Sequence, residues 1–340
     1  MASTILTSLA ARSSLSCLSF SSNLKRSPSH LLRRPRSILL RSGCSRLGQF
    51  PRRLCSVCFF NAGNESEGEP KKPLESGLEW AILKRWEVPW QWQTVSLTSL
   101  ACGLSFVLTG LVEIAALPYL GIKIEELSLD EKAEMLFLDQ SITTAVVLAV
   151  LYGITNSFQP VPDDVFRYDL RDPFNLQKGW ILWAGIGLFG ALLAIALTGV
   201  AMSALNGETS QRETDALVRL LPLIGSSSTS TACLVAITGI LAPVLEETVF
   251  RGFFMVALTK WVPTPISVLI SAAVFAIAHL TPGEFLQLFV LGTALGLSYA
   301  QTRNLMTPIT IHAFWNSGVI LILTFLQLQG YDIKELLQAT

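Results

Sequence analysis

The chain has 340 residues, of which 51% are hydrophobic and 15% charged, and its mean hydropathy is positive. This composition is too apolar for an ordinary soluble protein and is typical of a protein that crosses a membrane several times. Residues 1–60 hold ten basic and no acidic side chains, whereas the rest holds 15 basic and 25 acidic ones, a net charge of −10, which argues against a nucleic-acid partner.

Residues 1–60 have the composition of an organellar transit peptide. Their first ten positions are uncharged, the sixty residues contain fourteen serines, and none of them is acidic. A secretory signal would instead show a single apolar core. The uncharged start and the serine content favour a plastid over a mitochondrial address. We therefore expect a plant or algal protein of a chloroplast membrane, either thylakoid or envelope, and exclude this region from the fold.

Residues 61–93 are predicted to form a linker and an aromatic segment. Up to Gly77 the sequence is polar and rich in proline, glycine and glutamate, which is typical of a disordered linker. Tryptophans then precede the first long apolar run, at Trp80, Trp86, Trp90 and Trp92. Aromatic side chains at such a boundary predict an interfacial segment at the membrane surface.

The remaining chain holds several apolar stretches near the length of about 20 residues that a membrane span requires. We predict seven spans, or eight if a long one is broken, at 94–114, 137–157, 180–204, 231–258, 264–280, 284–301 and 306–327. The expected fold class is all-α, a polytopic transmembrane helical bundle with N-terminal membrane helices at 94–205 and a core at 231–328. The proline-containing connection 158–179 is expected to be non-helical, and serines and threonines before residue 231 to cap the next helix.

Two glycine patterns lie inside the predicted spans. Gly185-x-Gly187-x-x-Gly190 matches the dinucleotide-binding fingerprint, but no strand precedes it and no βαβ unit surrounds it. Close helix packing is the better interpretation there and at Gly292-x-x-x-Gly296.

Three ionisable side chains lie within the predicted span 231–258, namely Glu246, Glu247 and Arg251. An ionisable residue at bilayer depth costs roughly 2.5 to 3.5 kcal/mol, so it is a functional-site hypothesis by default. Glu247 and Arg251 are four residues apart and share a helix face, where they can neutralise each other. Glu246 then remains available for another partner.

Two further polar patches lie on later apolar segments. Outside residues 1–60 the chain has two histidines, His279 and His312; Phe275 lies one helical turn before the first, and Asn316 one turn after the second. Each polar side chain alone could simply hydrogen-bond between helices. Three patches on three helices in the last third of the chain favour a functional site.

Glu246-Glu247-x-x-x-Arg251, Phe275-x-x-x-His279 and His312-x-x-x-Asn316, in this order, resemble the three motifs of the CAAX protease and bacteriocin-processing family, also called Abi. Its eukaryotic relatives include the prenyl-dependent type II CAAX endopeptidase. The resemblance covers roughly residues 231–320 and implies an Abi-type core with intramembrane, glutamate-dependent endopeptidase activity. In that scheme Glu246 and His279 activate a water, and His312 and Asn316 stabilise the oxyanion. The supporting residues are Glu247, Arg251 and Phe275.

The chemistry of these residue types agrees with peptide hydrolysis. A carboxylate in a dry cavity can take a proton from water, and preformed donors stabilise an oxyanion by roughly 3 to 4 kcal/mol. No cofactor is expected, although two histidines and a glutamate also make a zinc ligand set; the H-E-x-x-H helix of zinc proteases is absent. A G-x-S-G motif of serine intramembrane proteases is absent too. The expected partners are the lipid bilayer and a membrane protein or peptide substrate.

Two alternatives to proteolysis stay open. The bundle could bind and stabilise photosynthetic or pigment-synthesis membrane proteins without cleaving them, or act as a structural anchor. Straight helices would also keep Glu246, His279 and His312 apart. We therefore predict broken or slanted helices beside the prolines that adjoin the motifs, Pro243, Pro282 and Pro308.

Overall fold

The computed structural model describes residues 81–206, 220 and 222–331, all of which belong to one compact unit. The predicted transit peptide, the predicted linker up to Gly77 and Trp80 lie outside the described residues. The helices are α2 (Trp92–Ala116), α3 (Leu129–Thr155), α4 (Trp180–Asn206), α6 (Ser228–Ala236), α7 (Ala242–Glu247), α8 (Val256–Leu258), α9 (Thr264–Ala278), α10 (Phe285–Thr302) and α11 (Met306–Leu328). The described ranges contain no β-strand, so the all-α fold class is confirmed.

Helix boundaries follow local capping signals. α6 begins after Ser227, whose hydroxyl accepts from the backbone N–H of Ser230 at 3.0 Å, as the expected serine cap requires. α3 begins well before the predicted residue 137, because Ser128 and Glu131 form a capping box in which each side chain accepts from the other's backbone N–H. The acidic first turn of α3 is therefore helical, and α3 begins eight residues before the predicted span 137–157.

Five helical stretches of the described residues are long and apolar enough to cross a membrane, at Trp92–Ala116, Leu129–Phe158, Trp180–Met202, Ser228–Leu258 and Met306–Leu328. The chain is thus a multi-pass membrane protein. The two other predicted spans correspond to α9 and α10, which do not meet both conditions. With 15 residues, α9 is about 22 Å long at 1.5 Å per residue, less than the roughly 30 Å of a bilayer's hydrocarbon core.

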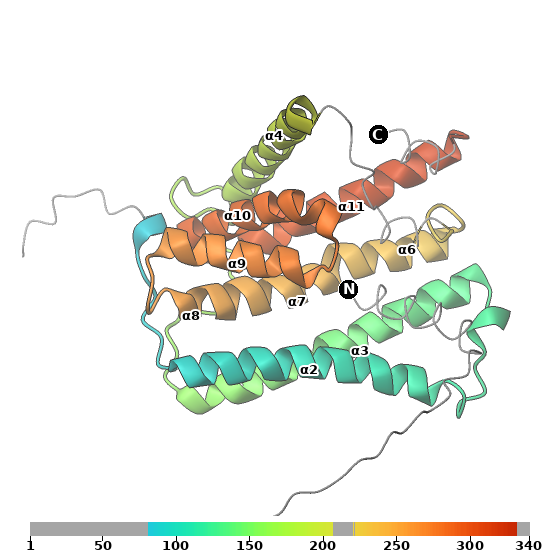
Figure 1. Ribbon diagram of the computed structural model, residues 1–340, viewed down its shortest axis with the longest axis horizontal. Helices are drawn as coiled ribbons and strands as arrows, with labels where there is room; N and C mark the ends of the chain where they lie inside the picture. The colour runs from blue at the N-terminus through green and yellow to red at the C-terminus, as the bar shows by residue number, and fades with distance from the viewer. Residues whose placement is uncertain (1–80, 207–219, 221, 332–340) are drawn as a thin grey trace, which may run out of the picture. The chain divides into compact units, whose positions relative to one another are not determined.

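The helices pack so that the span Ser228–Leu258 lies in the middle of the bundle. α2 and α3 lie side by side, and α3 contacts the start of the central span, while α9, α10 and α11 lie on its other side (Figure 1). α4 packs against α10 and α11. Large apolar side chains on its outward face are exposed, including Phe189 and Val200, each at 69%, as expected for a helix solvated by lipid.

Close helix contacts occur at three of the glycines noted in the sequence. A Cβ atom on Gly187 would lie 2.4 Å from Ser298 Oγ of α10, and one on Gly296 would lie 2.8 Å from a methyl group of Val268 on α9. A Cβ atom on Gly292 would lie 3.1 Å from the Cα of an α9 alanine. Helix packing, and not nucleotide binding, accounts for these glycines.

The aromatic segment before α2 is held by the protein at two points. Trp86 stacks on Tyr299 with ring centroids 5.4 Å apart, and the guanidinium of Arg303 lies 4.1 Å from the centre of the Trp86 ring. Trp90 is fully buried beside Phe253. These contacts fix the segment to the bundle, and its position at the membrane surface stays a prediction.

Candidate active site

The central span carries the paired glutamates between two π-helical stretches, Ile237–Leu241 and Thr248–Met255. In the first of them the N–H of Ala242 donates to the carbonyl of Ile237, five residues earlier. Pro243 follows directly and has no N–H to donate, so it favours this wider turn. The helix beside Pro243 is therefore distorted by a wider turn and not broken, where the sequence predicted a broken or slanted helix.

Glu247 and Arg251 form a fully buried ion pair, as their spacing predicts. Arg251 Nη1 donates to Glu247 Oε1 at 2.8 Å, and both side chains are 0% exposed. Arg251 Nη2 donates to the carbonyl of Gly292 on α10 at 3.2 Å, and its guanidinium lies over the Phe275 ring, 4.3 Å from the centroid. The pair thus joins the central span to α9 and α10.

His312 of α11 adds a third member to this buried pair. Its Nδ1 atom lies 2.8 Å from Glu247 Oε1. An ionised carboxylate can only accept a hydrogen bond, so Nδ1 carries the proton in this contact. Nε2 is left on the other side of the ring, 3.9 Å from Glu246 Oε2. Glu247 therefore sets both the tautomer and the direction of His312.

His279 is oriented in the same way by a backbone group. It follows the last residue of α9, and its Nδ1 atom lies 2.8 Å from the carbonyl oxygen of Phe275, which can only accept. The remaining nitrogen, Nε2, lies 3.8 Å from Glu246 Oε2. α9 ends here, because Leu280 takes a left-handed backbone conformation and Pro282 begins a new turn.

Glu246 is thus the carboxylate on which both imidazoles converge. Its Oε2 atom is buried and has no hydrogen-bond partner within the described residues, and the two Nε2 atoms at 3.8 and 3.9 Å are too far for direct hydrogen bonds. One water between them could bond to more than one of these atoms. The Glu246 side chain is 14% exposed and that of Glu247 is 0% exposed, so of the two carboxylates Glu246 is the accessible one.

Phe275 forms a platform beneath these groups. It is fully buried, its ring meets those of His279 and His312 at centroid distances of 4.5 and 5.9 Å, and Arg251 covers it. Asn316 lies elsewhere in the network. Its Nδ2 atom donates to the carbonyl of Thr238 at 3.2 Å, inside the first π-helical stretch; five residues after Thr238 comes Pro243, which has no N–H to donate to that carbonyl.

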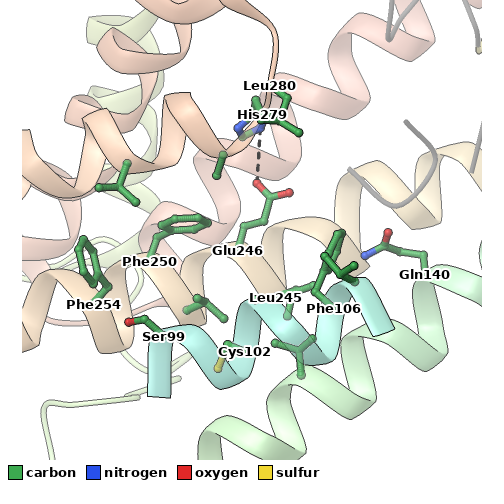
Figure 2. Close-up of a pocket in the computed structure, with 16 residues that line it drawn as sticks. Ser99, Cys102, Phe106, Gln140, Leu245, Glu246, Phe250, Phe254, His279 and Leu280 are labelled. Atoms are coloured by element: carbon green, nitrogen blue, oxygen red, sulfur yellow. Dashed lines mark ion pairs between the residues drawn. The ribbon is translucent and has the colours of Figure 1, made fainter. Parts of the chain in front are cut away.

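A cavity of about 400 Å³ opens beside Glu246 and His279 (Figure 2). Its walls come from α2, α3, the central span and the end of α9, and most of its lining residues are apolar. Phe106 of α2 and Gln140 of α3 line it opposite Phe250 and Phe254. Sequence reasoning missed the α2 and α3 residues, because a lone phenylalanine or glutamine in an apolar helix has no pattern that marks it as part of a site.

No group of three or more histidine, cysteine, aspartate and glutamate side chains in the described parts of the chain has the geometry to hold a metal ion. The two histidine Nε2 atoms and Glu246 Oε2 nevertheless have the chemistry of zinc ligands. Activity should therefore be measured with and without a zinc chelator.

Residues 228–318 match the family model described as type II CAAX prenyl endopeptidase, Rce1-like. A protein of Bacillus subtilis (strain 168) named "Putative membrane peptidase YdiL" is 26% identical over 176 residues, which cover 52% of this chain and 68% of that relative. No solved structure matches the chain significantly. The matched family segment begins with α6 and ends within α11, so it contains every site residue predicted from the sequence. The cavity walls from α2 and α3 lie outside it.

Proposed function

We propose that this polytopic membrane protein, which belongs to the CAAX protease and bacteriocin-processing family through residues 228–318, is an intramembrane glutamate-dependent endopeptidase. The observation that carries the proposal is the convergence of His279 Nε2 and His312 Nε2 on Glu246 Oε2 at the end of an apolar cavity. A base for hydrolysis must be within hydrogen-bond reach, or one water, of the groups it serves.

In the proposed reaction a water lies between Glu246 Oε2 and His279 Nε2. Glu246 accepts a proton from the water as the water oxygen bonds to the scissile carbonyl carbon. The C–N bond then breaks, and the departing nitrogen takes the proton from Glu246, which restores the carboxylate. Glu247 is less suited than Glu246 to act as the base, because Arg251 and His312 bond to its Oε1 atom and its side chain, including the unpartnered Oε2 atom, is 0% exposed.

His312 and Asn316 stabilise the oxyanion in this scheme, under conditions that the geometry defines. Nδ1 of His312 is engaged by Glu247, so His312 donates from Nε2 only when it is doubly protonated. Arg251 balances the charge of Glu247, and a cationic His312 would balance that of Glu246. Asn316 uses one N–H of its Nδ2 atom for the carbonyl of Thr238, so its role at the oxyanion would depend on the second N–H of that nitrogen.

The cavity supports a membrane protein or peptide as the substrate. Its lining is mainly apolar, so the group beside the scissile bond would be apolar and would reach the site from the lipid. We further propose a plastid membrane as the location, on the serine-rich, arginine-rich and acid-free composition of residues 1–60. A fluorescent fusion found outside plastids would contradict that location.

Complementation tests proteolysis against a non-proteolytic stabilising role. A plant or alga lacking the protein would receive Glu246→Gln, His279→Ala or Glu113→Gln at matched protein levels. Glu113 is a glutamate of α2 that does not line the cavity, so it controls for the loss of a membrane carboxyl group. If hydrolysis is the needed activity, Glu113→Gln should restore the phenotype, and Glu246→Gln and His279→Ala should not. Full rescue by Glu246→Gln would show that the protein works without hydrolysis.

A further inference from the structure

The loop of residues 161–172, between α3 and α4, packs against the central span beside the paired glutamates. The hydroxyl of Tyr168 lies 2.6 Å from Thr248 Oγ1, and Thr248 directly follows Glu247. The ring of Phe166 covers Gly252 one turn later, where a Cβ atom would come within 3.0 Å of it. Both contacts fall on the second π-helical stretch, Thr248–Met255, and the loop lies outside the matched family segment.

The Tyr168–Thr248 contact belongs to a chain of hydroxyl hydrogen bonds, and the single hydroxyl proton of Thr248 determines the direction of each bond. Thr248 Oγ1 donates to the carbonyl of Val244 at 2.5 Å, so it must accept from Tyr168. Tyr168 has then used its proton and accepts from Tyr152 of α3 at 3.0 Å. The chain Tyr152, Tyr168, Thr248, Val244 therefore ends on the helical turn that contains Glu246 and Glu247.

The same loop is bonded to the residues that start α11. The N–H of Leu305 donates to the carbonyl of Arg167 at 2.8 Å. Asn304 exchanges two hydrogen bonds with the backbone of Asp169, donating at 2.6 Å and accepting at 3.1 Å. His312 follows seven residues after Leu305 in the helix that begins there. One loop thus binds both the helix of the glutamates and the helix of His312.

Phe166, at the centre of this loop, has an unfavourable backbone conformation. Its φ of 56° lies in the left-handed region, which is unfavourable for a bulky side chain by roughly 1–2 kcal/mol. The conformation places its ring between Gly252 and Tyr152, whose ring centroid is 5.1 Å away. Strain of this kind persists where surrounding contacts determine it, and it is frequent beside functional sites.

We propose that Tyr168 is a positioning residue for the glutamate pair. Its hydroxyl fixes Thr248 and the turn before it, and its loop sets the position of that turn relative to the helix of His312. The distances from Glu246 Oε2 to the two imidazoles thus depend on a residue that touches none of these groups. The inference rests on the proposed function for its catalytic consequence, and its structural part does not need catalysis.

The structural part is tested by hydrogen exchange on the full chain in lipid nanodiscs. Tyr168→Phe keeps the ring and removes the hydroxyl, and Tyr152→Phe removes the outer hydroxyl while leaving the bond to Thr248. We expect faster exchange of backbone amides in residues 244–252 for Tyr168→Phe and little change there for Tyr152→Phe. Unchanged exchange in Tyr168→Phe, or equal changes in both variants, would overturn the proposal.

The catalytic part is tested with the quenched membrane peptide that the wild-type protein cleaves fastest from an apolar peptide library. Misplacement near 1 Å can lower rates up to about 100-fold, so we expect Tyr168→Phe to lower kcat about 10- to 100-fold with KM changed less than about twofold. Thr248→Val should lower kcat similarly, and the double variant should be no slower than either single one. Independent, multiplying losses would contradict action through Thr248.

Glu246→Gln in the same assay distinguishes a failure of the positioning role of Tyr168 from a failure of the proposed peptidase function. If Glu246→Gln abolishes cleavage and Tyr168→Phe leaves kcat unchanged, the positioning role is wrong and the proposed function stands. If Glu246→Gln cleaves normally, or the wild-type protein cleaves no peptide, the proposed function fails, and the exchange experiment still decides whether Tyr168 fixes the turn.

Discussion

At the scale of single residues, two neighbouring glutamates have opposite roles. Glu247 Oε1 is held by Arg251 and His312 at 2.8 Å each and its side chain is 0% exposed, whereas the Glu246 side chain is 14% exposed and lines the cavity. A carboxylate that neutralises buried charge contributes to stability, and an accessible one beside two imidazoles is suited to proton transfer.

The different roles of the two glutamates predict that a glutamate-to-glutamine change lowers stability at one position much more than at the other. Glu247→Gln leaves Arg251 buried without a counter-charge, so it should lower the free energy of unfolding by about 3 kcal/mol. Glu246→Gln removes no hydrogen bond to Oε2 and should change that free energy by less than about 1 kcal/mol. Unfolding of the purified variants in one detergent measures both values. Equal losses would contradict the assignment.

The pairing of Glu247 with Arg251 could be predicted from the sequence, because both residues share one helix and i, i+4 spacing determines their contact. The bond from His312 to Glu247 and that from Asn316 to Thr238 could not, because each joins residues about 65 to 80 positions apart and depends on how two helices pack. Tyr168 was missed for the same reason.

At the scale of elements, hydropathy and capping signals determine most helix ends. α4 and α11 begin at the predicted residues, since apolar runs bounded by polar and proline residues leave few alternatives. The early start of α3 was missed because its first turn is acidic, although Ser128 and Glu131 form a recognisable capping box. The π-helical stretches have no hydropathy signal and could not be predicted.

The contact between α9 and α10 predicts contrasting effects of glycine substitutions. Gly296→Ala would bring a Cβ atom to 2.8 Å from Val268, which should cost about 1–3 kcal/mol of stability. Gly103→Ala in α2 has nothing within 4 Å and should be neutral or stabilising by up to about 1 kcal/mol, because alanine favours a helix. Thermal unfolding of the two variants compares them. A stable Gly296→Ala would mean that α9 and α10 pack less closely.

At the scale of the whole molecule, the described residues form a helical bundle with apolar outward faces, which requires lipid around α2 and α4. The cavity is lined by the central span and the end of α9 on one side and by the paired α2 and α3 on the other. The site is therefore a property of both halves of the membrane domain, although the family match covers the C-terminal one.

If α4 spans the membrane, the free energy of inserting an arginine should depend strongly on whether it lies within α4 or in the loop before it. Phe189→Arg places a charge on the lipid-facing side of the span and should cost roughly 2.5 to 3.5 kcal/mol of insertion free energy. Leu176→Arg, at an 82% exposed position in the loop before α4, should insert normally. The integrated fraction after translation into membranes measures both. Equal insertion would place Phe189 outside the bilayer.

The central claim is that Glu246 activates water for peptide hydrolysis, and peptide termini measured in ¹⁸O-labelled water test it most directly. Wild-type protein and Glu246→Gln would be incubated in liposomes with the apolar peptide library, with and without a zinc chelator, and new C-termini identified by mass spectrometry. The account predicts new termini that carry ¹⁸O with wild-type protein, regardless of chelator, and none with Glu246→Gln. The same labelled termini at the same rate from Glu246→Gln would contradict it.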